Sequence, residues 1–200
     1  MTNKYEHSIL FLEGRSGIGK STMILEAGAS KSHQGAGLFS QRMHNAKGHT
    51  VGFRLIPYGD VTCSIGVYEQ GMKQMFLQDI GNQRVLDLSV FESARKLIGD
   101  YGHASFLVLD EIGGVELQLA SFRELLYELL DSGIPCIGVL KAKENYEHMN
   151  MHVKDMNQSK ESYDKLRKCL VDQYNSRILS LTQDNYEEVK REVLQFFEQI

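Results

Sequence analysis

The stretch Gly14-Arg15-Ser16-Gly17-Ile18-Gly19-Lys20-Ser21 decides the fold, because it has the spacing G-x-x-x-x-G-K-S of a phosphate-binding loop, the Walker A motif. An apolar run at residues 8–12 precedes it, and a helix-compatible stretch at residues 21–30 follows it. Strand, loop and helix in this order are the context that the motif requires. The pattern therefore predicts a loop that binds the phosphates of a nucleotide.

The residue types in this loop have separate chemical roles. Glycines let the backbone bend and turn its N–H groups toward a phosphate, and the positive end of the following helix adds to the attraction. Lys20 supplies a point charge for the β- and γ-phosphates, and the Ser21 hydroxyl can ligate Mg²⁺. We expect the nucleotide to be held by Gly14, Arg15, Ser16, Gly17, Ile18, Gly19, Lys20, Ser21 and Thr22.

The composition is that of an ordinary globular protein. The 200 residues predict a single domain, residues 1–200, and the net charge of −4 gives no general reason to expect nucleic acid or an anionic membrane as a partner. Three cysteines without a C-x-x-C pair fit free thiols in a reducing compartment. The first apolar run is too short for a signal peptide, and no run approaches the ~20 residues of a membrane helix. We therefore expect a cytoplasmic protein.

Apolar patterns along the chain predict a layered α/β fold. Short apolar runs between residues 37 and 80, separated by Gly, Asn, Pro and Asp, predict antiparallel hairpins. Continuous apolar runs at 105–109 and 136–140 suit strands that are covered on both faces of a parallel sheet. Helical periodicity at 90–101, with Gly102 as its expected end, and at 117–130 supplies the covering helices.

The C-terminal part adds a strand at 177–181 and a last helix. Residues 141–175 lack a long apolar run and read as a lid or insertion whose second part, roughly 159–174, is helical; a protein partner could bind there. The fold class we expect is therefore the three-layer P-loop NTPase fold. Its sheet is RecA-like and mostly parallel, with an antiparallel extension and a C-terminal insertion or lid.

A second acidic motif completes the predicted site. In Leu107-Val108-Leu109-Asp110, apolar strand residues are followed by Asp, as in a Walker B motif, and this Asp110 can hold Mg²⁺ together with Ser21. Glu111 is the candidate to orient and deprotonate an attacking water. Because side chains alternate along a strand, the two carboxylates are expected on opposite faces. A third acid, Glu116, is expected to cap the following helix.

These residues carry a resemblance to a known family. G-R-S-G-I-G-K-S-T followed by D-E-I-G-x-x-E-L resembles the THEP1-type nucleoside triphosphatases, small P-loop proteins that hydrolyse ATP, GTP and related nucleotides slowly. Residues 37–40 and Gly52-Phe53 are also similar to that family. The resemblance implies that the phosphate and Mg²⁺ roles carry over to Gly14, Gly17, Gly19, Lys20, Ser21, Thr22, Asp110 and Glu111.

The chain departs from the family pattern in places that could carry a second positive charge. Gly114-Val115 stands where the family usually has Lys-Met, Arg42-Met43-His44 where it tends to have E-V-R, and Asn185-Tyr186 where it often has Asn-Arg. Phosphoryl transfer usually needs a further cation on the phosphates. The candidates that we favour are Arg42 and Lys141.

Taken together, the motifs predict Mg²⁺-dependent hydrolysis of a nucleoside triphosphate such as ATP to the diphosphate and phosphate. One alternative is a small-molecule or nucleotide kinase, in which the γ-phosphate passes to a bound hydroxyl. The other is a nucleotide-gated binding module in which slow hydrolysis serves as a timer. The base preference and the oligomeric state are not indicated by the sequence.

Overall fold

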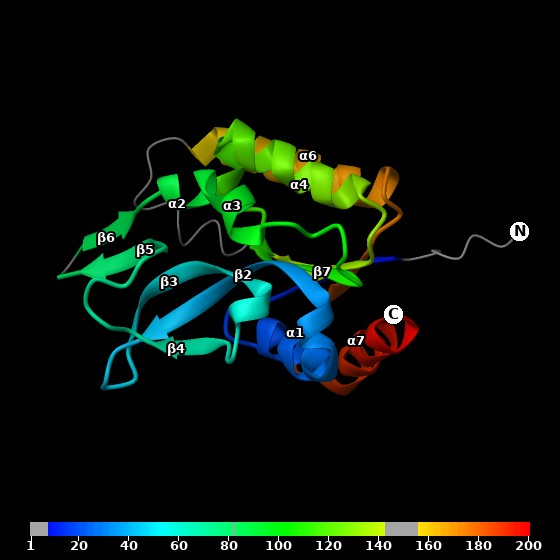
Figure 1. Ribbon diagram of the computed structural model, residues 1–200, viewed down its shortest axis with the longest axis horizontal. Coiled ribbons are helices and arrows are strands. Elements are labelled where there is room, and N and C mark those ends of the chain that lie inside the picture. The colour runs from blue at the N-terminus through cyan, green and yellow to red at the C-terminus, as the bar shows by residue number, and fades with distance from the viewer. Residues whose placement is uncertain (1–7, 82, 143–155) are drawn as a thin grey trace, which may run out of the picture.

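Nine strands of the described residues form one sheet that runs through the middle of the molecule (Figure 1). The structure is a computed structural model that describes residues 8–81, 83–142 and 156–200. The strand order is β6-β5-β3-β2-β7-β8-β1-β9, and β4 lies off this path beside β2. The strands are β1 (Ile9–Glu13), β2 (Gly35–His44), β3 (Thr50–Pro57), β4 (Ile65–Val67), β5 (Met75–Ile80), β6 (Gln83–Leu86), β7 (Phe106–Ile112), β8 (Cys136–Leu140) and β9 (Arg177–Ser180).

The sheet has a parallel half and an antiparallel half that share β2. Strands β2, β7, β8, β1 and β9 pair in parallel, whereas β3, β5 and β6 extend the sheet in antiparallel pairing. This is the predicted mostly parallel sheet with an antiparallel extension. Two pairings within residues 35–80 were not foreseen, since the first part of β2 is parallel to β7, and β4 is parallel to β2.

Helices cover both faces of the sheet. Figure 1 shows α2, α3, α4 and α6 on one face and α1 and α7 on the other. The helices are α1 (Lys20–Gly28), α2 (Ser89–Glu92), α3 (Ala94–Ile98), α4 (Ala120–Asp131), α6 (Met156–Asp172) and α7 (Tyr186–Gln199), with 3₁₀ turns at Ala29–Gln34, Tyr58–Asp60 and Val115–Gln118.

Strand β1 shows why apolar runs without alternation predicted a sheet buried on both sides. Ile9 and Phe11 pack into the core beneath α4 and α6, and Leu10 and Leu12 pack into the core beneath α1 and α7. All four side chains are at most 5% exposed. The strand that leads into the phosphate loop is therefore anchored from both sides.

The helix expected at residues 90–101 is shorter and broken. It forms α2 and α3 with Ser93 between them, and it ends at Gly99 rather than Gly102. The reason lies in the backbone, because Gly99 has a φ of 67°, which a glycine adopts without strain and which stops the helix.

The helical part of the 141–175 segment is α6. Its side chains Tyr163, Leu166 and Leu170 are at most 3% exposed and belong to the core under α4. The described part of this segment is therefore a layer helix of the domain. Residues 143–155, the other part of the predicted lid and partner surface, lie outside the described residues.

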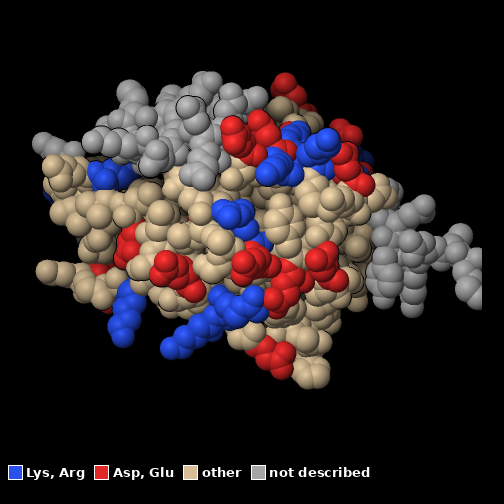
Figure 2. Space-filling model, turned by 90° about the horizontal axis from the view of Figure 1, so that it is seen from above, with Lys and Arg blue, Asp and Glu red and all other residues tan. Residues whose placement is uncertain are grey.

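The surface carries both signs of charge. Figure 2 shows Lys and Arg side chains interspersed with Asp and Glu side chains on the face seen there. None of the helices in the described part of the chain has the length and apolarity needed to cross a membrane.

The strand order determines which residues lie together at the carboxyl edge of the parallel half of the sheet. Strand β8 separates β1 from β7, which is the RecA-like arrangement, and the three strands run in the same direction. The residues after β1 and the last residues of β7 therefore lie at the same edge of the sheet. This edge brings residues 14–22 near Asp110 and Glu111.

Candidate active site

Residues 14–19 form the loop between β1 and α1. Gly14, Gly17 and Gly19 have φ angles of 142°, 81° and 104°, a region that favours glycine. Gly14 also lacks room for a side chain, because a Cβ there would lie 2.5 Å from the carbonyl oxygen of Leu181. Gly19 is the N-cap residue of α1 and makes no side-chain cap, so the first turn of α1 presents its backbone N–H groups toward the loop.

Lys20 lies inside this loop. Its side chain is largely buried (4% exposed), and Nζ donates hydrogen bonds to the carbonyl oxygens of Gly14 at 2.8 Å and of Arg15 at 3.1 Å. Burial lowers the pKa of the Lys20 ammonium, while the carboxylates of Glu111 and Asp110 act in the opposite direction. The ammonium is thus a cation held in the loop by neutral carbonyls, close to two acids.

Ser21 and Asp110 meet across the edge of the sheet. Ser21 Oγ donates a hydrogen bond to Asp110 Oδ1 at 2.7 Å, although the two residues are 89 positions apart. The other oxygen, Oδ2, accepts a hydrogen bond from the backbone N–H of Ser40 at 3.3 Å. Asp110 is only 4% exposed, and burial, followed by the neighbouring Glu111 charge, raises the pKa of its carboxyl group.

Glu111 does not follow the alternation expected for a strand. Its φ is 57°, and the pairing of β7 with β8 shifts register between Leu109 and Ile112. The charges of Glu111 and Asp110 both raise the pKa of the Lys20 ammonium, against the effect of burial. A non-glycine residue in left-handed conformation stores backbone strain, which is a frequent property of functional positions.

Arg42 is the second cation at this place. Its Nη2 donates to the hydroxyl oxygen of Ser16 at 3.3 Å, and its guanidinium carbon lies 5.5 Å from the centre of the Phe53 ring. A cavity of about 120 Å³ is lined by Arg42 together with Lys20, Ser21 and Glu111. Of the two favoured cations, Arg42 therefore lies against the phosphate loop.

Lys141, the other favoured cation, has a different environment. Its Nζ lies 3.5 Å from Glu116 Oε2, and the two side chains are 13% and 2% exposed. Glu116 also accepts a hydrogen bond from the Gly114 backbone N–H. It lies in the 3₁₀ turn Val115–Gln118, and the first turn of α4 contains no acidic residue, so Glu116 does not cap the following helix as expected. A Cβ at Gly114 would lie 2.2 Å from Lys141 Nζ, so the lysine occupies the space that a side chain at position 114 would need.

Some neighbours of the predicted residues were missed from the sequence. Ser40 supplies a backbone N–H to Asp110, and Ser64 shares a hydrogen bond with Thr22, with 3.0 Å between the hydroxyl oxygens. Phe53 packs against Arg42. No pattern of residue types indicated Ser40, because its place beside Asp110 follows from the parallel pairing of β2 with β7, which sets Leu38 opposite Leu109.

The comparisons with known proteins agree with this geometry. The sequence model of a family described as NTPase matches residues 9–194. The chain belongs to this NTPase family. The match covers both the phosphate loop and the acidic pair, and membership makes the chain a nucleoside-triphosphatase.

The chain is similar to curated proteins and to solved structures. The nucleoside-triphosphatase THEP1 of Hyperthermus butylicus is 26% identical over 144 residues, 67% of this chain and 71% of the relative. That of Saccharolobus solfataricus is 26% identical over 134 residues, 66% of this chain and 74% of the relative.

Two solved structures share the fold of this chain. THEP1 from the hyperthermophile Aquifex aeolicus has a TM-score of 0.58 at 17% identity and covers 95% of this chain and 98% of its own. A human cancer-related nucleoside triphosphatase has a TM-score of 0.57 at 19% identity and covers 94% of this chain and 95% of its own. The resemblance expected from the sequence is thereby confirmed, at modest identity.

Proposed function

We propose that the chain hydrolyses a nucleoside 5′-triphosphate, in the presence of Mg²⁺, to the diphosphate and inorganic phosphate. The observation that carries the proposal is the 2.7 Å hydrogen bond between Ser21 and Asp110. A phosphate loop alone would be a binding site, and an acidic strand end alone would be ordinary. Their direct contact supports a site in which phosphates and a divalent cation are held together.

Mg²⁺ fits the groups that meet here. The Ser21 hydroxyl and the Asp110 carboxylate are hard oxygen donors of the kind that Mg²⁺ accepts. The Asp110 carboxylate is buried beside a second acid, which is an unfavourable place for a negative charge unless a cation compensates it. When bound, Mg²⁺ supplies positive charge to the phosphate oxygens.

The chain's own residues account for the remaining requirements. The N–H groups of residues 14–22 bind the phosphates, with the Lys20 ammonium turning from its carbonyl partners to the β- and γ-phosphates. Glu111 accepts a proton from a water molecule as the water oxygen bonds to the γ-phosphorus. The bond from that phosphorus to the bridging oxygen then breaks, and the diphosphate leaves with the electron pair.

Arg42 is the group placed to neutralise charge on the transferring phosphoryl group. It reaches the loop through Ser16, and the Phe53 ring supports its guanidinium. Since Lys141 is paired with Glu116, we assign the second cationic role to Arg42. The role is electrostatic, as is usual in phosphoryl transfer.

The size of the cavity favours water over a larger acceptor. The space bordered by Lys20, Arg42 and Glu111 is about 120 Å³. Pockets that hold small organic ligands measure roughly 300–1,000 Å³. Hydrolysis is therefore better supported than transfer to a small-molecule hydroxyl.

A nucleotide panel tests the proposal. Phosphate and nucleoside diphosphate are measured for ATP, GTP, CTP and UTP with Mg²⁺, and again after EDTA is added. Release of both products without an acceptor, lost with EDTA and in the Lys20→Ala variant, is the expected result. Diphosphate formation only with an added acceptor would favour a kinase. Turnover that rises with a protein partner would favour the nucleotide-gated module.

A further inference from the structure

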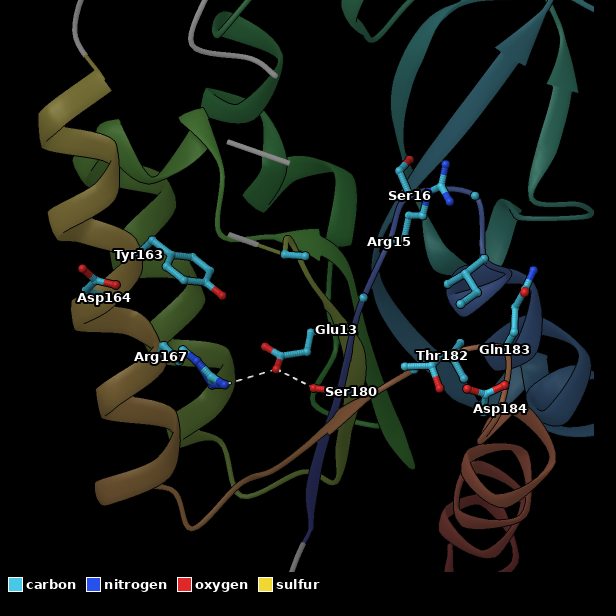
Figure 3. Close-up of a pocket in the computed structure, with 15 residues that line it drawn as sticks. Glu13, Arg15, Ser16, Tyr163, Asp164, Arg167, Ser180, Thr182, Gln183 and Asp184 are labelled. Atoms are coloured by element: carbon cyan, nitrogen blue, oxygen red, sulfur yellow. Dashed lines mark hydrogen bonds and ion pairs between the residues drawn. The ribbon is translucent and has the colours of Figure 1, made fainter. Parts of the chain in front are cut away.

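A large cavity lies on the other side of the phosphate loop, toward α6. It measures about 1210 Å³ and is bordered by residues 14–18, by α6 and by residues 180–184 after β9 (Figure 3). This volume accommodates a small organic ligand, unlike the space around Glu111. A nucleotide whose phosphates occupy the loop needs such a space for its sugar and base.

The wall formed by residues 180–184 is held in place by hydrogen bonds. The Asn185 Oδ1 atom accepts hydrogen bonds from the Thr182 backbone N–H at 2.7 Å and from the Thr182 hydroxyl at 3.0 Å. The Asn185 amide nitrogen Nδ2 donates to the carbonyl oxygen of Ser180 at 2.8 Å. This wall therefore has a definite shape before any ligand enters.

Glu13 is one of three acidic residues that line the cavity, together with Asp164 and Asp184. It is the last residue of β1, directly before Gly14, and its side chain is 17% exposed. Arg167 Nη2 lies 3.2 Å from Glu13 Oε1, and Ser180 Oγ donates to that same oxygen at 2.8 Å. Strand β9 and helix α6 thus both fix the position of this carboxylate.

The second oxygen of Glu13, Oε2, accepts no hydrogen bond from the described residues, which are 8–81, 83–142 and 156–200. Figure 3 shows both dashed lines meeting at one oxygen, while the other is directed toward the space beside Tyr163. An ionised carboxylate has acceptor capacity on each oxygen, so Oε2 can accept a hydrogen bond from a ligand.

From this arrangement we propose that the cavity is the nucleoside subsite, and that Glu13 Oε2 accepts a hydrogen bond from a hydroxyl of the ribose. The inference rests on the proposed function, since it extends a nucleotide bound at the phosphate loop. Recognition of a sugar hydroxyl by an acidic side chain is established chemistry in other nucleotide-binding folds. It gives the site a preference for ribonucleotides over deoxyribonucleotides.

Calorimetry with diphosphates tests the inference without interference from hydrolysis. The probes are ADP, 2′-deoxy-ADP, 3′-deoxy-ADP and inorganic tripolyphosphate, each with Mg²⁺. We expect the wild-type protein to bind ADP about tenfold more tightly than at least one deoxy analogue, because a hydrogen bond to a charged acceptor is lost. Glu13→Ala removes this preference, and Glu13→Gln reduces it. Neither variant changes the affinity for tripolyphosphate.

Two controls separate recognition from a structural role. Glu161→Gln removes an exposed carboxylate of α6 that is not among the residues lining the cavity, and it leaves the preference intact. Thermal unfolding shows that the Glu13 variants are folded. If the Glu13 variants lose affinity equally for all four probes, the role of Glu13 is structural and the inference is overturned.

The outcome also tells the two proposals apart. A wild-type protein that binds ADP and both deoxy analogues equally overturns the subsite and leaves the phosphate site standing. A wild-type protein that binds neither ADP nor tripolyphosphate overturns the proposed function together with the subsite.

Discussion

On the β7 side of the phosphate loop, Lys20, Arg42 and Glu111 line a space of about 120 Å³. On the α6 side, a cavity of about 1210 Å³ is lined by several polar side chains, among them the carboxylate of Glu13, which is held by Arg167 and Ser180. Beside the small space on the β7 side, the buried Asp110 is joined to the Ser21 hydroxyl and to the Ser40 backbone N–H by hydrogen bonds. On the α6 side, the lining residues border a much larger cavity. Charges gathered around a small space suit bond breaking, and a wide cavity with polar side chains along its wall suits recognition of a ligand.

Removing the cation in the loop is the strongest test of this contrast. Lys20→Ala takes the ammonium away from the β7 side and leaves the α6 side unchanged. We expect turnover to fall by at least about a thousandfold, in line with electrostatic contributions measured in other enzymes. Phosphate release measures the effect. Turnover within tenfold of wild type would show that Lys20 does not act on the phosphates.

Glu111→Gln separates binding from chemistry on the β7 side. The amide keeps the size of the side chain but cannot accept the proton of the water. We expect turnover to fall by about a hundredfold to ten-thousandfold while the affinity for ADP with Mg²⁺ stays the same. Full activity in this variant would remove Glu111 as the base.

Arg42→Met tests whether the second cation acts in the transition state. The side chain keeps much of its apolar contact with Phe53 but loses its charge. We expect kcat to fall by about a hundredfold with little change in ADP affinity. Arg84→Met is the matched control, because Arg84 pairs with Asp79 on an exposed strand, and we expect it to be active. A fully active Arg42→Met variant would show that Arg42 is not the second cation on the phosphates and that another residue has this role.

The acidic pair predicts a pH dependence of Mg²⁺ binding. Burial and Glu111 raise the pKa of Asp110, so this carboxyl group keeps its proton to a higher pH than an exposed Asp. The proton must leave before a metal binds, and the apparent Mg²⁺ affinity in the presence of ADP therefore falls by up to about tenfold per pH unit below that pKa. Above it the affinity is constant. Calorimetry across pH measures the slope, and an identical slope in Asp110→Asn would contradict the assignment.

Lys141→Met has the smallest expected effect on turnover. The variant leaves Glu116, which is 1% exposed, without its cationic partner. We expect the free energy of unfolding in urea to fall by about 3 kcal/mol, while kcat of the folded protein stays within about threefold. The exposed Arg84–Asp79 pair gives the comparison, since its loss costs under about 1 kcal/mol. A large loss of kcat with unchanged stability would place Lys141 on the catalytic side.

Much of the site was predictable because it depends on local patterns. The glycine spacing at residues 14–19 is typical of a phosphate-binding loop, and the apolar run before Asp110 is typical of a buried strand, which the structure shows as β7. The parallel direction of both strands follows from their burial on both faces. These patterns were sufficient to place Ser21 and Asp110 at one edge.

The remaining parts depend on contacts between distant segments. The regular strand expected through Glu111 is interrupted by a register shift and by a φ of 57°, and neither is visible in the residue types. Lys141 and Arg42 looked equivalent in the sequence. Their neighbours separated them, since Glu116 lies beside one and Ser16 beside the other.

The sequence by itself therefore predicted a phosphate-binding loop between a buried strand and a helix, because glycine spacing and apolar runs act on the nearest neighbours along the chain. Only the tertiary structure distinguished Arg42 from Lys141 as the proposed cation for the phosphates and revealed the cavity proposed for a nucleoside. The reason is that such sites combine side chains from distant segments. In the cavity, for example, Glu13, Arg167 and Ser180 come together from three separate elements when the sheet forms.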